Sequence, residues 1–76
     1  MVHKENAINY LWHKAKSDQD KALMSLGLLM DHPAGIGDHS TEDFNTNLDD
    51  ALNLLVDADD RLHALKKYFP EEGSDV

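Results

Sequence analysis

The sequence predicts an all-α fold in which two helices of nearly equal length form an antiparallel hairpin. Each half of the chain carries an apolar stripe with members three and four positions apart, and a segment rich in proline and glycine separates the halves. Such spacing keeps one side of a helix against a partner. The first stripe contains Ile8, Trp12, Ala15, Gln19, Ala22, Leu26 and Leu29. The second contains Phe44, Leu48, Ala51, Leu55, Ala58, Leu62, Leu65 and Phe69.

The two stripes match in constant register when the chain folds back on itself. One set of layers pairs Ile8 with Leu65, Ala15 with Ala58, Ala22 with Ala51 and Leu29 with Phe44. The other set pairs Trp12 with Leu62, Gln19 with Leu55 and Leu26 with Leu48. Alanine facing alanine allows the two backbones to approach closely. Gln19 either fixes this register as a buried amide or lies partly exposed at the edge of the pair.

The helix boundaries follow from local signals within a single domain, residues 1–76. We expect the first helix over about 4–31, where good helix formers dominate and no proline interrupts. Residues 32–40 contain one proline and two glycines and are expected to form a loop. Ser40 or Thr41 can cap a second helix over about 41–69, and the tail 70–76 is expected to be disordered.

Composition excludes several classes of function. Seven basic and fifteen acidic residues give a net charge of −8, which repels phosphate backbones and argues against direct nucleic-acid binding. The chain has no cysteine, so disulfides and thiolate metal sites are excluded. The longest apolar stretch, residues 22–30, is shorter than the roughly 20 residues that cross a bilayer. With no apolar signal core at the N-terminus either, we expect a cytoplasmic protein without a membrane span.

Apolar residues beside the stripes predict a partner. A chain of this length is marginally stable alone, and one hairpin cannot cover every apolar residue that flanks its seam. We therefore expect a homodimer that forms a four-helix bundle. The predicted dimer interface consists of Leu11, Leu23, Met30, Leu52 and Val56. A helix from a different protein is the alternative occupant of this surface.

The segment between the helices carries two Asp-His pairs, which suggest a metal site. Imidazole and carboxylate groups are suitable ligands for zinc or iron. The candidate ligands are Asp31, His32, Asp38 and His39. Asp and His are also frequent near helix ends, where they cap the backbone and complement the helix dipole. We therefore expect no cofactor and keep zinc or iron as the alternative.

No catalytic constellation is recognisable, because two helices offer no rigid concave scaffold for a nucleophile and its base. We expect a non-enzymatic protein that binds another protein. One alternative is a small metal-binding or ligand-binding bundle that uses the loop Asp and His residues. A second is an acidic mimic of nucleic acid, with test positions at Asp49, Asp50, Asp57 and Asp60.

A resemblance adds context to this expectation. The run DHPAGIGDHSTEDF, followed by LDDALNLLVDADDRLHALKKYF, resembles short acidic helical proteins of marine tailed phages and their bacterial neighbours. The likeness extends over most of the chain from Trp12 onward. It implies an accessory factor that binds a host component, and it assigns no site residue.

Overall fold

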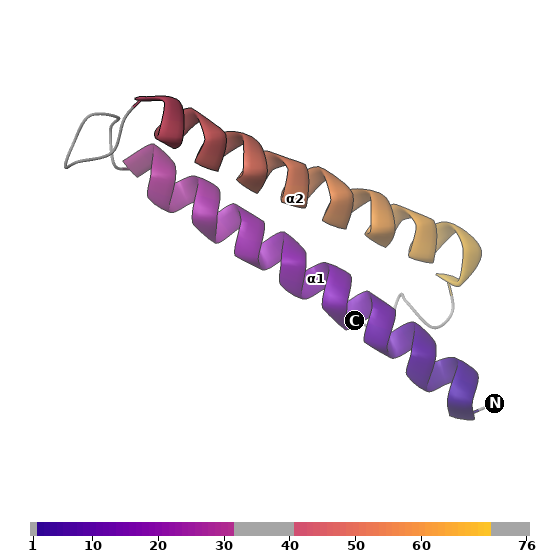
Figure 1. Cartoon of the computed structure of the whole chain (residues 1–76). Coiled ribbons are helices and arrows are strands. Elements are labelled where there is room, and N and C mark those ends of the chain that lie inside the picture. The colour runs from indigo at the N-terminus through magenta and orange to yellow at the C-terminus, as the bar shows by residue number, and fades with distance from the viewer. Residues whose placement is uncertain (1, 32–40, 71–76) are drawn as a thin grey trace.

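The computed structural model of the chain is a pair of antiparallel helices that lie side by side along most of their length (Figure 1). Helix α1 spans Val2–Asp31 and helix α2 spans Thr41–Tyr68. The structure describes residues 2–31 and 41–70, so the predictions for the loop and for the last residues of the tail lie outside the described residues. The all-α class and the antiparallel hairpin are confirmed.

The charges at the helix ends explain part of the helix boundaries. Glu42 and Asp43 lie in the first turn of α2, and Lys66 and Lys67 lie in its last turn. Both placements complement the helix dipole, which is positive at the N-terminus and negative at the C-terminus. Helix α1 has an acidic residue in its first turn but no basic residue in its last turn. Its stability therefore depends more on helix propensity and on packing against α2.

The core of the hairpin follows the two predicted stripes. All of its buried residues belong to them, and they are Ile8, Trp12, Ala15, Ala22, Ala51, Ala58, Leu62 and Leu65. Four of these eight are alanine, and no large side chain is completely buried. Because small side chains remove little apolar surface from water, this core contributes modest stability.

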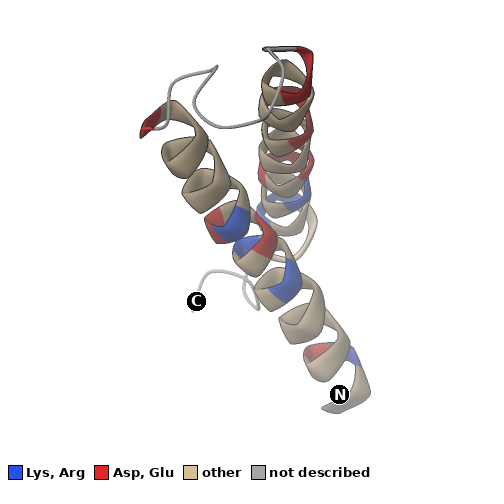
Figure 2. Cartoon of the chain, turned by 60° about the vertical axis from the view of Figure 1, so that its left-hand side comes forward, with Lys and Arg blue, Asp and Glu red and all other residues tan. Residues whose placement is uncertain are grey.

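Burial is uneven along the hairpin. Trp12, Ala15, Leu62 and Leu65 form a compact cluster near the N-terminus of α1, and Phe69 packs against it. At the opposite end the stripe residues are half-buried, and they are Leu26, Leu29, Phe44 and Leu48. Figure 1 and Figure 2 show that the two helices cross at an angle. The half of the hairpin that contains the C-terminal end of α1 therefore has an incomplete core.

Candidate functional site

One side of the hairpin carries most of the predicted interface, and we call it face 1. Residues that follow Ala15, Ala22 or Leu29 by one position lie on one side of the α1 stripe, because each residue turns the helix by about 100°. Because the helices are antiparallel, the residues of α2 that follow Ala51, Ala58 or Leu65 lie on the same side of the hairpin as these α1 residues. Face 1 is formed by Lys16, Leu23 and Met30 of α1 and by Leu52, Val56, Asp59 and Lys66 of α2.

The contacts of the structure agree with this assignment. Gln19 Nε2 donates a hydrogen bond to Asp59 Oδ1 at 2.8 Å across the two helices. Lys66 Nζ lies 5.9 Å from the centroid of the Trp12 ring. A small groove on the same side is lined by Trp12, Lys16, Gln19, Leu62 and Lys66. These residues form the polar half of face 1, next to the well-packed end of the hairpin.

The apolar half of face 1 lies next to the open end of the hairpin. Leu23, Leu52 and Val56 are 52%, 50% and 51% exposed, and Met30 is 69% exposed. Leu23 and Leu52 lie at the same level, because Ala22 and Ala51 pair in the register of the hairpin. Four large apolar side chains therefore lie on the same side of the hairpin and are left exposed by residues 2–31 and 41–70.

The opposite side, which we call face 2, is formed by residues that precede the stripe residues. Leu11 and Asp18 belong to it in α1, and Arg61 belongs to it in α2. Two open grooves of about 410 and 420 Å³ lie here. The first is lined by Leu11, Lys14, Arg61, Ala64 and Leu65. The second, near the open end, is lined by Ser25, Leu28, Leu29, Asn47, Asp50, Ala51 and Leu54.

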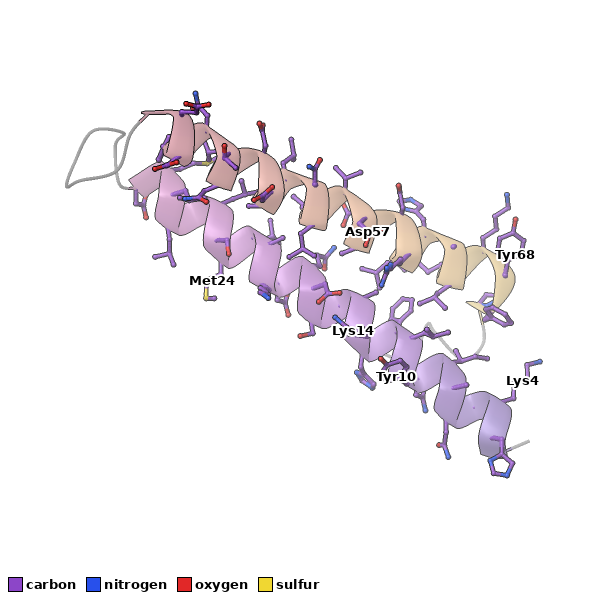
Figure 3. The ribbon with its side chains drawn as sticks, in the orientation of Figure 1. Lys4, Tyr10, Lys14, Met24, Asp57 and Tyr68 are labelled. Atoms are coloured by element: carbon purple, nitrogen blue, oxygen red, sulfur yellow. The ribbon has the colours of Figure 1, made fainter. Side chains whose placement is uncertain are left out.

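The predicted interface residues therefore divide between the two faces. The structure brings Leu23, Met30, Leu52 and Val56 together on face 1, and it places Leu11 on face 2. All five are exposed, from 49% for Leu11 to 69% for Met30. Tyr10 and Met24 form a separate outer surface, on the side of α1 that points away from α2 (Figure 3). Helical spacing alone could have separated Leu11 from the others, because it precedes its stripe neighbour Trp12 whereas Leu23 follows Ala22.

Polar features of face 1 were harder to anticipate. The stripe register predicts Leu55 opposite Gln19, yet the amide bonds the Asp59 carboxylate and also accepts from Lys16 Nζ at 2.8 Å. The indole N–H of Trp12 is buried and has no hydrogen-bond partner among the described residues. An unpartnered buried donor is costly and points to an acceptor from outside this part of the chain.

The candidate metal ligands are mostly beyond what the structure describes. His32, Asp38 and His39 lie outside the described residues, and Asp31 is the exposed last residue of α1. Within residues 2–31 and 41–70, no three His, Cys, Asp or Glu side chains are placed to hold a metal ion together. His63 Nδ1 lies 3.3 Å from the backbone oxygen of Asp59, so this imidazole contacts the preceding turn of its own helix.

Acidic residues are concentrated in the N-terminal two thirds of α2, where Figure 2 shows red segments, and basic residues lie toward its C-terminal end. Helix α1 contains four basic and four acidic residues, whereas the stretch 42–60 of α2 contains seven acidic residues and no basic one. The four positions considered for nucleic-acid mimicry, Asp49, Asp50, Asp57 and Asp60, are all exposed. Asp57 Oδ2 is already paired with Arg61 Nε at 3.2 Å. Asp49 and Asp60 lie on the outer side of α2, and Asp50 and Asp57 lie on its face 2 side, so the acidic surface extends over both.

The membrane expectation and the comparisons complete this description. In the part of the chain that the structure describes, neither helix is long and apolar enough to span a bilayer. Comparison with protein families, with curated proteins and with solved structures finds no match to this chain.

Proposed function

We propose that the protein is a non-enzymatic protein-interaction module of the cytoplasm, which self-associates through face 1 into a four-helix bundle and binds a basic protein through the acidic surface of α2. The observation that carries the proposal is the apolar half of face 1. Leu23, Met30, Leu52 and Val56 are each at least half exposed on one continuous surface. Exposed apolar surface of this extent marks interaction sites in small proteins.

The weakness of the core supports self-association. Half of the eight buried residues are alanine. The stripe residues at the open end, next to the apolar half of face 1, are only half-buried. Small domains of this kind gain stability from disulfides, metals or oligomerisation. The chain contains no cysteine, which leaves oligomerisation as the simplest of these means. A second copy on face 1 would place Leu23 and Leu52 inside a four-helix core.

The acidic stretch of α2 supports a basic partner. Asp59 lies on face 1, but Asp49, Asp50, Asp57 and Asp60 lie on the outer side of α2 or on face 2 and stay accessible when face 1 is covered. Steering by such a charged surface accelerates association with a partner of opposite charge. The resemblance to phage proteins agrees with an accessory factor of this kind, and we include that role in the proposal.

A matched pair of variants tests the role of face 1. Leu52→Asp places a charge on face 1, and Leu11→Asp places the same charge on face 2 at nearly equal exposure, 50% against 49%. Burying a leucine contributes about 1.5–3 kcal/mol, and a tenfold change in affinity corresponds to about 1.4 kcal/mol. We therefore expect Leu52→Asp to raise the dimer dissociation constant at least about tenfold in sedimentation equilibrium, with Leu11→Asp close to wild type.

Circular dichroism of both variants reports whether they remain helical, because in so small a chain loss of the dimer and loss of the fold can coincide. Loss of helix in Leu52→Asp that protein concentration restores still supports the proposal, because folding is then linked to association. Equal dissociation constants for the two variants would overturn the role of face 1. A monomeric wild-type protein would overturn self-association altogether.

A further inference from the structure

We propose that the second copy docks on face 1 with the two hairpins pointing the same way, so that α1 of each copy lies beside α2 of the other. This inference rests on the self-association proposed above and specifies its geometry. A two-fold axis parallel to the long axis of the hairpin generates this parallel arrangement. In the competing arrangement the two-fold axis is perpendicular to the long axis, and the two hairpins point in opposite directions. Each helix then lies against the same helix of the other copy.

The distribution of apolar residues favours the parallel arrangement. Face 1 has one apolar half, with Leu23 and Leu52 at the same level, and one polar half, with Lys16 and Asp59. A parallel axis keeps every level unchanged, so the apolar halves of the two copies meet. A perpendicular axis reverses the order of residues along the hairpin. The position of Leu23 in one copy then lies next to Lys16 of the other. Burying a charged group against leucine without a partner is unfavourable.

The charges of the helices favour the same arrangement. Neighbouring helices in a bundle are about 8–10 Å apart, which is within the Debye length of about 10 Å at moderate salt. The perpendicular axis would place the acidic stretch 42–60 of α2 beside the same stretch of the partner, with seven acidic residues on each side. The parallel axis places that stretch beside the partner's α1, in which four basic and four acidic residues balance and Lys16 lies on face 1. Repulsion between the two acidic stretches is thereby avoided.

The polar half of face 1 also fits a parallel partner. Lys16 and Asp59 lie at the same level, because Ala15 and Ala58 pair in the register, so Lys16 of one copy faces the partner's Asp59. Within its own chain, Lys16 Nζ contacts Gln19 Oε1 at 2.8 Å and lies 3.9 Å from Asp20, and its side chain stays 51% exposed. The groove beside it is lined by Lys16, Lys66 and the Trp12 side chain. This donor-rich groove suits an incoming carboxylate.

Distances between two spin labels distinguish the two arrangements. The chain has no cysteine, so Ala7→Cys and Lys21→Cys each give one label per copy. Both positions are exposed on α1 and are two heptads apart, so the labels project in nearly the same direction. Ala7 lies about 17 Å along the axis from the middle of the hairpin and Lys21 lies about 4 Å from it, at 1.5 Å per residue. Lys21→Cys is therefore the matched control.

In the parallel arrangement we expect nearly equal label separations for the two variants by double electron–electron resonance. In the opposite arrangement the Ala7→Cys labels would be displaced by about 35 Å along the axis and the Lys21→Cys labels by about 8 Å. A separation clearly longer for Ala7→Cys would overturn the parallel arrangement and leave self-association intact. Absence of dipolar coupling in both variants, with helicity retained, would overturn self-association itself.

Discussion

Gln19 links the two helices through polar atoms at the middle of an otherwise apolar seam. Its amide donates to Asp59 on α2 and accepts from Lys16 on its own helix. A chain of hydrogen bonds of this kind contributes little net stability at a half-exposed position, but it favours one register over others. Trp12 illustrates the opposite situation on the same face, since its indole N–H is buried without a partner among the described residues. The hydrogen bond between Gln19 and Asp59 and the buried donor of Trp12 therefore both belong to face 1.

Asp18 gives a pH-dependent prediction at the level of one residue. Lys14 Nζ contacts both of its carboxylate oxygens, at 2.8 and 2.9 Å, and this hydrogen bond is the main reason that the pKa of Asp18 lies below its ordinary value of 3.8. A lowered pKa in the folded state means that the carboxylate stabilises the fold above about pH 4, and that this contribution disappears as the pH falls through the lowered pKa. We expect Lys14→Met to raise the pKa of Asp18.

The measurement is an NMR titration of the Asp18 side-chain carboxyl carbon in wild type and in Lys14→Met. Lys4→Met is the control, because Lys4 is not among the groups that lower this pKa. Desolvation raises this pKa, and the charges of Arg61 and Lys21 lower it, so Lys14→Met removes the largest lowering contribution and leaves these smaller ones in place. An unchanged pKa in Lys14→Met would show that the Lys14 contact is not formed in solution.

At the level of the helices, the periodicity of the sequence predicted the fold well. Both helices and their buried residues follow the two stripes, because a repeat of three and four positions leaves a single side of a helix for packing. The incomplete burial of Leu29 and Phe44 could not be predicted in this way, since a stripe specifies which residues face the partner but not how closely the helices approach. The candidate site was predicted in part. The apolar flank was identified, whereas its division into two faces and the contact between Gln19 and Asp59 were not.

The alanine layers give a prediction about the distance between α1 and α2. Ala58 and Ala15 pair at the seam, and they are 0% and 1% exposed. A larger side chain at position 58 has no room unless the helices separate, and overpacking of this kind typically costs about 1–3 kcal/mol. We expect Ala58→Leu to lower the free energy of unfolding by this amount, measured by urea denaturation at a fixed protein concentration. Ala64→Leu, at an exposed position of the same helix, should change it by less than about 0.5 kcal/mol. Equal stability of the two variants would contradict close packing at the alanine layers.

For the whole molecule, the central feature is a hairpin with one well-packed end and one open end. The chain extends over 53 × 16 × 16 Å, so nearly every residue is close to the surface. The apolar half of face 1 continues the seam at the open end, where the hairpin needs additional cover. The acidic stretch of α2, the mixed charges of α1 and the apolar half of face 1 together support the proposal that the protein completes its core by association.

The mass of the wild-type protein in solution tests this account most directly. Light scattering over a dilution series should give twice the chain mass of 8.5 kDa at high concentration, falling toward 8.5 kDa on dilution with a parallel loss of helix. A mass of 8.5 kDa with full helicity at every concentration would contradict the account, because the hairpin would then be stable with face 1 uncovered.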